Sequence, residues 1–516
     1  MRLLILGPPG TGKTTTIVSL VQDLLAEGFD STEIALVSFT KAAVGELRDR
    51  LAASTGRSNW PMVRTLHSIC TQLTGRSRFM QPKHWKEFCQ LARYDIPPEQ
   101  ASEDGLTDVP APTEDSKLRA VHNYARSRQL PLDQAVHLAS TRVDLDRLRK
   151  YVERLTAYKK DHDLCDFTDV IEEAVERTLT IGARAIVIDE AQDLSPLQIA
   201  FVGTQIDVAD VAIVAGDDDQ AIFEFQGASP EWIRALHTAP GWTTRILGQS
   251  WRCPERVRAA AMFVIARATD RVEKTYAPRP APGTYAHAGL ETAIDHAVQS
   301  GDSTMVLCRS GRGCELATKY LFRSGVPYIT ERGPGPRPYA NAKLIDAIRT
   351  MHGISRGAVN TLAFARAVED FCASAKHGGH IKHGGKKRIS LFSADAICLA
   401  DLDGMGLSDF SEAITSDPWA VFTANTDQDV LQYLRTLWRG HGHLPEPTIT
   451  VTTWHSSKGR EAHRVIVYAG IPRVCAEAIR EGVGNSEHRA AYVAMTRAKQ
   501  TLCIASAVDG CEYPFP

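Results

Sequence analysis

The chain opens with the pattern of a phosphate-binding loop. An apolar run at residues 3–6 is typical of a buried strand, and residues 7–14 read Gly-Pro-Pro-Gly-Thr-Gly-Lys-Thr. Helix-spaced apolar residues follow, with Gly28 as a candidate C-cap. Glycines in such a loop let backbone N–H groups close around phosphates, and the helix N-terminus adds partial positive charge. This order of strand, loop and helix indicates a nucleoside triphosphate site rather than a chance glycine-rich turn.

Two side chains of this loop carry the expected chemistry. Lys13 would reach the β- and γ-phosphates, and the Thr14 hydroxyl would hold Mg²⁺. We therefore predict a nucleoside triphosphate and Mg²⁺ as cofactors. The remaining residues of the predicted phosphate-binding loop are Gly7, Pro8, Pro9, Gly10, Thr11, Gly12 and Thr15.

A pair of carboxylates follows a second apolar run. Residues 184–193 read Arg-Ala-Ile-Val-Ile-Asp-Glu-Ala-Gln-Asp, which places Asp189 and Glu190 at the carboxyl end of a predicted strand. Ligands of open α/β sheets gather at that edge. We expect Asp189 to hold Mg²⁺ through water, and Glu190 to orient and deprotonate the attacking water. The alternative is a solvated acidic strand end.

A third apolar run, 211–215, ends in Gly-Asp-Asp-Asp-Gln. Gln220 is positioned to hydrogen-bond the γ-phosphate or the attacking water, and so to report whether the phosphate is present. Because the glutamine side chain is neutral, its loss of the phosphate partner costs little free energy. The alternative is that Asp217 to Asp219 form only a turn.

Short apolar runs alternate with helical stretches along the whole chain, which indicates α/β architecture with parallel, doubly wound sheets. The runs form two clusters, one before about residue 245 and one after it, and each is interrupted by a polar, helix-leaning insert. The expected boundaries are 1–73 and 168–245 for the first core, 74–167 for its insert, 246–345 and 446–516 for the second core, and 346–445 for its insert.

Charge and composition exclude several classes of protein. The 516 residues carry a formal net charge of −2, so nucleic-acid contacts must come from a local basic track. No segment approaches a membrane span. The 11 cysteines include no C-x-x-C pair, which argues against a zinc ribbon and favours a reducing, cytoplasmic setting. Because the predicted strand begins at residue 3, we expect no signal peptide before it.

The ordered motifs resemble superfamily 1A DNA helicases of the UvrD/Rep/PcrA type. The resemblance covers both predicted cores but not the inserts. Each segment is unremarkable singly, whereas nine segments in the family's order leave little room for coincidence. The matching segments are residues 7–14, 38–43, 65–68, 166–169, 189–193, 216–228, 249–252, 453–461 and 492–498.

The resemblance implies two RecA-like P-loop NTPase cores, each with a mainly helical inserted subdomain. It also implies an ATP-dependent translocase on single-stranded DNA that unwinds duplexes, running 3′ to 5′. The expected partners are single-stranded DNA, single-strand/duplex junctions, and a nuclease or a repair or replication protein. The alternatives are an ATP-switched nucleic-acid-binding recruitment factor, the motor subunit of a helicase–nuclease or defence complex, and, as an outsider, a P-loop kinase.

The resemblance also implies roles around the nucleotide. Arg252 and Arg497 match the two arginines that the second core contributes to the γ-phosphate, and a guanidinium suits the charge spread over a transferring phosphoryl. Trp251 matches the aromatic residue that stacks on the nucleotide base, with a buried core indole as the alternative. Further matches near the nucleotide are Gln249, Gly459 and Glu461.

For the DNA track, Phe39 and Phe225 match aromatic residues on which a base stacks, and ordinary core phenylalanines are the alternative. Gln226 stands where an arginine is usual in the family, which removes one positive charge from this track. The other positions that match contacts to single-stranded DNA are Thr40, Lys41, Thr65, His67 and His455.

Two segments depart from the family pattern or lie outside it. Only Met1 and Arg2 precede the first strand, so we expect the adenine-reading segment to be missing and ATP to be selected less strictly over other purine triphosphates. The basic, glycine-rich run from Lys376 to Arg388 is either a duplex DNA contact or a solvated loop. A metal site formed by His377, His380 and His383 is a further alternative.

Overall fold

The computed structural model describes residues 1–38, 40–96, 113–139, 141–330, 337–372, 379–422, 427–508 and 510–516. The predictions for Phe39, Lys376 and His377 lie outside these residues. The chain divides into two compact units. The first contains Met1–Gly283, Glu477–Thr496 and Pro516, and the second contains Thr284–Ala476 and Arg497–Phe515.

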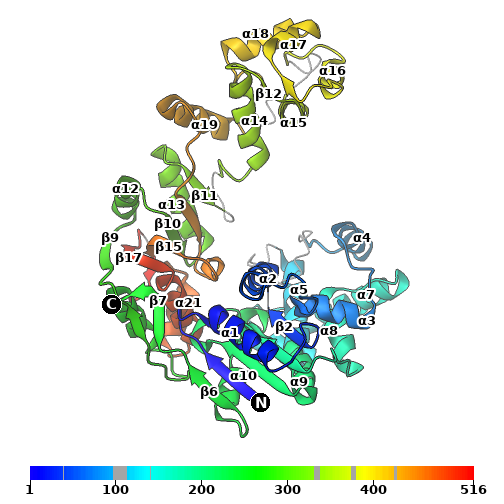
Figure 1. The fold of residues 1–516 in the computed structure, drawn as a ribbon, viewed down its shortest axis with the longest axis vertical. Coiled ribbons are helices and arrows are strands. Elements are labelled where there is room, and N and C mark those ends of the chain that lie inside the picture. Colours follow the sequence, from blue (N-terminus) through cyan, green and yellow to red (C-terminus); the bar gives the residue numbers. More distant parts are fainter. Residues whose placement is uncertain are drawn as a thin grey trace. The chain divides into compact units, whose positions relative to one another are not determined.

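The first unit is built on a six-stranded sheet in which all strands run parallel, in the order β3-β2-β4-β5-β1-β6. Figure 1 shows β2 and β6 of this sheet. Its central strands read as almost continuous apolar runs because both faces are covered. The strands are β1 (Arg2–Leu6), β2 (Ile34–Ser38), β3 (Val63–Thr65), β4 (Ala185–Ile188), β5 (Val211–Gly216) and β6 (Thr243–Ile246).

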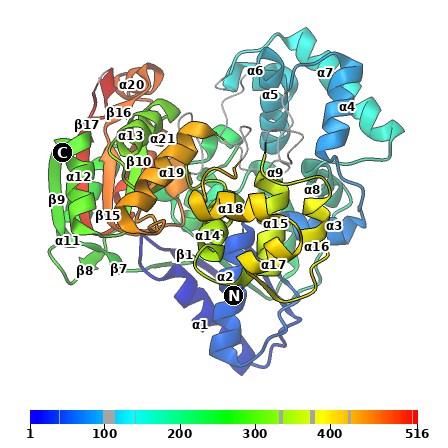
Figure 2. The same ribbon diagram turned by 90° about the horizontal axis from the view of Figure 1, so that it is seen from above.

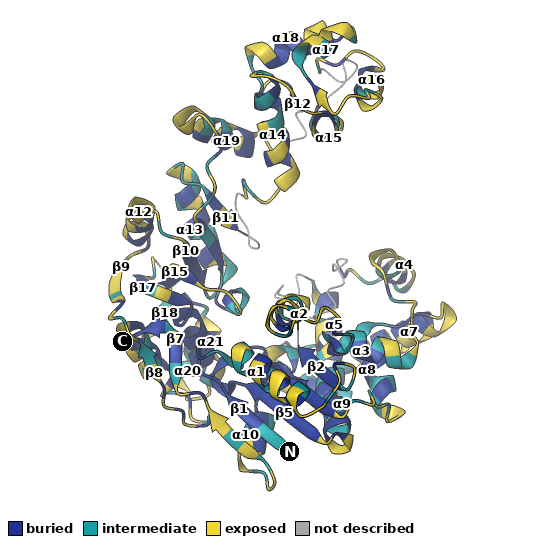
Figure 3. Ribbon diagram, in the orientation of Figure 1, coloured by how far each residue is buried: buried dark blue, intermediate teal, exposed yellow. Residues whose placement is uncertain are grey.

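Alternate residues of β1 point to opposite faces of this sheet. Ile5 belongs to a hydrophobic cluster with α1 (Lys13–Ala26) and α2 (Lys41–Thr55). Its neighbours Leu4 and Leu6 belong to a cluster on the other face. Figure 3 shows the resulting burial of the strands. The helices of that second cluster are α3 (Leu66–Thr74), α8 (Phe167–Glu176), α9 (Pro196–Val208) and α10 (Glu231–Thr238).

Between α3 and α8 the described chain forms four helices and one isolated β-bridge, Phe79 to Cys165. Figure 2 shows the helices beside one another. They have a hydrophobic cluster of their own around Phe88, Leu118 and Tyr151. This agrees with a helical insert, whose exact boundaries remain a prediction. The helices are α4 (Pro82–Ala92), α5 (Glu114–Arg128), α6 (Leu132–Leu138) and α7 (Leu145–Asp161).

The first unit extends further than the predicted end of the first core at residue 245. It continues to Gly283 and takes in residues 477–496. The cause is local packing, because the backbone of Trp251 bonds to the P-loop and the residues after it pack on a returning helix. The added elements are β7 (Gln249–Pro254), α11 (Glu255–Ile265), β8 (Ala277–Arg279) and α21 (Asn485–Met495).

The second unit contains another six-stranded parallel sheet, in the order β11-β14-β10-β15-β17-β9. Two parallel sheets confirm the predicted α/β class. The strands are β9 (Thr284–Gly289), β10 (Thr304–Cys308), β11 (Tyr328–Thr330), β14 (Ile449–Thr453), β15 (Ala462–Tyr468) and β17 (Ala498–Ser506).

Helices α12 (Leu290–Ser300) and α13 (Gly311–Arg323) share one hydrophobic cluster with this sheet and with the helices of residues 342–441. Those helices are α14 (Ala342–Ile354), α15 (Thr361–Phe371), α16 (Gly385–Ser390), α17 (Leu399–Gly404), α18 (Ser408–Ser416) and α19 (Gln428–His441). The remaining short elements are β12 (Val359–Asn360), β13 (Ala396–Ile397), β16 (Gly470–Ile471), α20 (Arg473–Arg480) and β18 (Cys511–Glu512). Among the described residues, no helix is both long and apolar enough to cross a membrane.

A partly buried ionic cluster joins the first insert to α8. Asp166 caps α8 by accepting hydrogen bonds from its first-turn N–H groups. The same carboxylate bonds to Arg126 of α5 at 2.8 Å and to Lys159 of α7 at 2.8 Å. Asp169 bonds to both cations as well. The segment 166–169, which matches a family motif, therefore has a structural role here.

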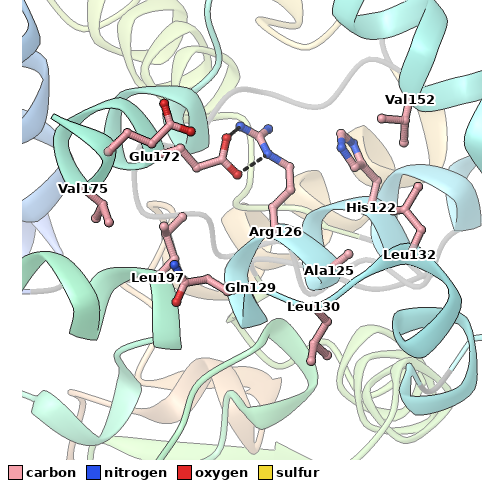
Figure 4. A pocket seen from close by; sticks show the side chains of 11 residues that line it. His122, Ala125, Arg126, Gln129, Leu130, Leu132, Val152, Glu172, Val175 and Leu197 are labelled. Carbon is pink, nitrogen blue, oxygen red and sulfur yellow. Dashed lines mark hydrogen bonds and ion pairs between the residues drawn. The ribbon is translucent and has the colours of Figure 1, made fainter.

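Beside this cluster lies a pocket of about 350 Å³, shown in Figure 4. Arg126 points across it toward Glu172, which accepts a hydrogen bond at 2.9 Å. His122 lies on the same helix and is 6% exposed. None of the predicted site residues lines this pocket, so we assign it to the packing of helices α5 to α9.

His122 is expected to make the first unit sensitive to acid. Burial, together with the charge of Arg126, lowers the pKa of its imidazole to about 3, from about 6.5 in an unfolded chain. Between these two pKa values, His122 is protonated in the unfolded state and neutral in the folded state. The stability contributed by neutral His122 is therefore lost as the pH falls from about 6.5 toward 3.

The substitution His122→Phe should flatten the pH dependence of the free energy of unfolding by up to about 1.4 kcal/mol per pH unit between roughly pH 6 and 4. Urea denaturation at several pH values measures this slope. His137→Phe, on the exposed side of α6, is the control and should leave the slope unchanged. Equal slopes for the wild type and His122→Phe would contradict the prediction.

Candidate nucleotide and nucleic-acid site

Three predicted motifs meet at one edge of the first sheet. Because its strands are parallel, the residues after β1, β4 and β5 all leave at the same edge. The ladder continues into the loops, since Gly7 N–H donates to Gly216 O at 3.0 Å and Asp189 N–H donates to Val37 O at 2.9 Å. The P-loop, the carboxylate pair and the Gln220 loop are therefore neighbours.

The P-loop has the backbone of an anion cradle. Gly12 stands at the N-cap of α1 with φ 81°, where it offers no side-chain acceptor to the first-turn N–H groups. A Cβ on Gly7 would lie 2.0 Å from Cγ of Lys13, so only glycine lets that side chain fold back over the loop. The Lys13 ammonium donates to Gly7 O at 3.2 Å and lies 3.8 Å from Glu190 Oε1. Thr14 is half-buried beside it.

The carboxylate pair is held in an unusual backbone conformation. Asp189 is 4% exposed, and burial followed by the charge of Glu190 raises its pKa to about 7. A cation beside Asp189 would stabilise its charged carboxylate and offset the cost of burying that charge. Asp189 is therefore suited to bind a divalent metal ion. Glu190 has φ 54°, in the left-handed region, and its N–H donates to Asp189 Oδ1 at 2.9 Å. Backbone strain of this kind is concentrated at functional sites.

The aspartates after β5 form more than a turn. Asp218 to Gln220 make a single 3-10 turn, and Gln220 Nε2 donates to Asp217 Oδ2 at 2.7 Å. The buried ammonium of Lys274 lies 3.2 Å from Asp217 Oδ1 and 3.0 Å from Asp219 Oδ2, and it also pairs with Asp218. Arg271 forms a second pair with Asp219 at 2.6 Å.

Sequence reasoning missed both cations of this cluster. Lys274 lies 56 residues from Asp218 and Arg271 lies 52 residues from Asp219. No local pattern marks either residue. The signal that could have raised the question is the run of three aspartates itself, because adjacent carboxylates at the end of a buried strand require counter-charges.

Residues 249–252 lie directly against the P-loop. The Ser250 hydroxyl is fully buried and donates to Pro9 O at 2.8 Å, while Trp251 N–H donates to Gly10 O at 2.8 Å. A Cβ on Gly10 would lie 2.3 Å from Cβ of Arg252. The resemblance assigned Arg252 to the second core, whereas the compact first unit includes it together with the P-loop.

The Trp251 side chain is 67% exposed, which excludes the alternative of a buried core indole. The side chain of Gln249, two residues earlier, makes hydrogen bonds within the protein. Its Nε2 donates to Pro278 O at 2.7 Å and to Ser250 O at 2.9 Å. The bond to Pro278 O joins β7 to β8.

In the second unit, three predicted nucleotide residues gather where β15 and β17 begin. Ala462 N–H donates to the carbonyl of Arg497, and the Arg497 side chain is 2% exposed. Glu461 pairs with Lys499, one strand away. Gly459 has φ 80°, a conformation that favours glycine.

Several predicted DNA contacts have structural partners as well. The Thr40 hydroxyl caps α2 and the Thr65 hydroxyl caps α3, each accepting a first-turn N–H. Sequence reasoning missed this capping, although threonine just before a helix is its usual signal. The His67 ring meets Phe167 edge-on at 5.9 Å between ring centroids.

The remaining predicted contacts are more open. Phe225 is 47% exposed on the 3-10 turn Glu224–Gln226, so it is not a core phenylalanine. Gln226 and His455 are half-buried, and Lys41 is exposed at the start of α2. His455 begins a 3-10 turn after β14 in the second unit.

The described part of the run 376–388 contacts other residues of the second insert. Lys382 pairs with Asp409 at 3.1 Å, and Lys386 donates to Glu369 O at 3.0 Å. Its last residues belong to α16, so the expectation of a continuous loop is wrong there. Among described residues, including His380 and His383, there is no group of three or more potential metal ligands.

Lys274 should be one of the most sensitive lysines in the first unit. Lys274→Met leaves three buried carboxylates without this counter-charge, and removing one partner of a buried ion pair costs about 3–5 kcal/mol. Lys117→Met removes a pair with the exposed Glu114 and should cost about 1 kcal/mol or less. Urea denaturation followed by tryptophan fluorescence compares the two, and similar losses would contradict this account.

Comparison with known proteins agrees with this geometry. Residues 1–240 match the UvrD/REP helicase N-terminal domain, and residues 435–509 match the UvrD-like helicase C-terminal domain. The chain is 27% identical over 372 residues to ATP-dependent DNA helicase UvrD2 of Mycobacterium tuberculosis, covering 64% of this chain and 53% of that protein.

Two Escherichia coli proteins are similar over shorter stretches. ATP-dependent DNA helicase Rep is 25% identical over 287 residues, covering 52% of this chain and 42% of Rep. DNA helicase II is 28% identical over 300 residues, covering 53% of this chain and 39% of that protein. The matched stretches thus span about half the length of these relatives, or less. With both family domains present in order and the P-loop edge assembled, the chain belongs to the UvrD/Rep family of helicases.

Proposed function

We propose that this protein is an ATP-driven motor that moves along single-stranded DNA and separates duplexes. The observation that carries the proposal is the convergence of the P-loop, the Asp189–Glu190 pair and the Gln220 loop at one sheet edge in a chain of this family. The relatives named above are DNA helicases, two of them described as ATP-dependent.

In this proposal the first unit binds and hydrolyses ATP. The P-loop N–H groups and Lys13 hold the phosphates. Mg²⁺, held by Thr14 and Asp189, would neutralise charge on the β- and γ-phosphates. Glu190 accepts the proton of the attacking water, and Gln220 reports the γ-phosphate. The 3.8 Å separation of the Glu190 carboxylate from the Lys13 ammonium supports this assignment, because the base for the attacking water must lie close to the γ-phosphate.

We assign to Arg252 and Arg497 the role of stabilising the negative charge that develops on the transferring phosphoryl group. The contact between Arg252 and the P-loop backbone supports the first of these. The exposed indole of Trp251 is available to stack on the base. Gln249, Gly459 and Glu461 complete the proposed nucleotide site.

The proposed strand track uses stacking and phosphate contacts. Phe225, half exposed on its turn, offers a face to any base, which suits a motor that moves regardless of sequence. Thr40, Lys41, Thr65, His67, Gln226 and His455 are the proposed contacts to the strand. The direction of movement, 3′ to 5′, rests on the resemblance to the family.

Removal of the Lys13 ammonium or the Glu190 carboxylate tests the hydrolytic site. Lys13→Ala and Glu190→Gln should each lower DNA-stimulated ATP hydrolysis by about 100-fold or more, because general-base catalysis and phosphate contacts are lost. Phosphate release measured with and without single-stranded DNA gives the rates, and circular dichroism checks folding. Stimulated turnover near the wild-type rate in either folded variant would refute the assignment.

Strand displacement tests the motor itself. The wild type should separate duplexes with a 3′ single-stranded tail, and should act poorly on 5′-tailed and blunt duplexes. Lys13→Ala is the negative control. Faster separation of 5′-tailed duplexes would reverse the proposed direction. ATP hydrolysis without displacement of any substrate would instead support an ATP-switched recruitment factor or a motor that needs a partner subunit.

Phe225 should contribute to binding of single strands. Loss of one stacked base contact costs about 1–3 kcal/mol, so Phe225→Ala should raise the Kd for an oligothymidylate by about fivefold or more. Phe263→Ala is the matched control, because Phe263 is 54% exposed on α11 and is not among the proposed contacts. Fluorescence anisotropy measures both. An equal Kd for the two variants would remove Phe225 from the track.

A further inference from the structure

The buried amide of Gln192 joins two parts of the proposed hydrolytic site. This side chain is fully buried in the 3-10 turn Ala191–Asp193. Its Nε2 donates to Glu190 Oε2, and its Oε1 accepts the Asp217 N–H at 3.0 Å. Asp217 in turn accepts from Gln220 Nε2 at 2.7 Å. One amide therefore links the carboxylate after β4 to the glutamine loop after β5.

The surroundings of Gln192 fix its position. A Cβ on Gly216 would lie 2.6 Å from Gln192 Oε1, so the strand end admits this amide only because residue 216 is glycine. Glu190, two residues before Gln192, has a left-handed backbone. A hydrogen bond from a rigid donor is one way to hold a carboxylate in such a strained turn.

We infer that Gln192 is a positioning residue for ATP hydrolysis, which holds the Glu190 carboxylate and couples it to the Gln220 loop. The inference rests on the proposed function of this edge. Movement of the Gln220 loop would be transmitted through the Asp217 N–H and the Gln192 amide to Glu190. Gln192 itself is three residues from Asp189 in the chain and acts only through its neighbours.

The chemistry requires an amide at this position. Its nitrogen donates on one side while its oxygen accepts on the other, and both groups are neutral. Glutamate has the same shape, but its carboxylate accepts only and would meet Glu190 with like charge. Methionine has similar length and offers no N–H donor.

The first experiment separates positioning from binding. Gln192→Met and Gln192→Glu should each lower kcat for DNA-stimulated hydrolysis by about 100-fold, as expected for a displaced catalytic group, while the KM for ATP stays within about threefold. Gln205→Met is the control. Gln205 is also buried, accepts the Ile181 N–H at 2.8 Å and donates to Leu179 O at 2.9 Å, away from the P-loop edge. Its kcat should stay within about twofold of the wild type.

The second experiment asks whether Gln192 acts through Glu190. In single-turnover hydrolysis, Gln192→Met should have little further effect when Glu190→Gln is already present, because the two changes remove one shared function. A purely structural loss would instead multiply the two effects. Hydrogen exchange of peptides covering residues 216–220 should also be faster in Gln192→Met and unchanged in Gln205→Met, with no nucleotide present.

The outcomes distinguish this inference from the proposed function. An active wild type with normal kcat in both Gln192 variants overturns the inference alone. The inference alone is also overturned if the kcat losses of Gln192→Met and Glu190→Gln multiply in the double variant. The same holds if the control Gln205→Met lowers kcat as much as the Gln192 variants do. A wild type without DNA-stimulated hydrolysis overturns the proposed function, and the inference falls with it.

Discussion

The parallel pairing of β1 with β5 is the constraint on which the proposed site depends. Its ladder runs from Arg2 opposite Ala212 to Leu6 opposite Gly216, and one further bond joins Gly7 to Gly216. This register brings the P-loop beside the loop that contains Gln220. A shift by one residue would turn Ile5 and Leu6 to the wrong faces of the sheet and would also separate the two loops. Core packing and site geometry are thus set by the same hydrogen bonds.

Buried carboxylates at this edge have two different charge environments. Asp217, Asp218 and Asp219 lie beside the permanent positive charges of Lys274 and Arg271. Burial raises the pKa of Asp217 and of Asp189 alike, but Lys274 opposes that rise at Asp217, whereas the charge of Glu190 adds to it at Asp189. Asp189 is therefore the carboxylate that an added cation would stabilise most.

Much of this arrangement was predictable because it is local in sequence. Each of three motifs can be recognised from about ten consecutive residues: the P-loop, the strand before Asp189 and the glutamine loop. Parallel strands then bring the ends of these segments to one edge of the sheet. Lys274 and Gln192 were not predictable in their roles. Lys274 supplies its counter-charge from 56 residues away in the sequence, so no local pattern reveals it. Gln192 lies in a matched motif, but no function was predicted for it.

The division of the chain was harder to foresee for a related reason. Periodicity locates strands, and the second cluster of strands correctly indicated a second sheet. It does not reveal that β7 and α11 pack on the first unit, since that depends on backbone bonds such as Trp251 N–H to Gly10 O. The exposure of Trp251 and Phe225 likewise follows from tertiary packing that apolar residue type alone does not specify.

The late return of α21 to the first unit affects how the protein can be made. Arg489 of this helix is fully buried and pairs with Glu224 at 2.9 Å and with Asp270 at 2.8 Å. Those carboxylates leave the ribosome more than two hundred residues earlier. During translation the interior of the first unit therefore stays incomplete until α21 has been synthesised.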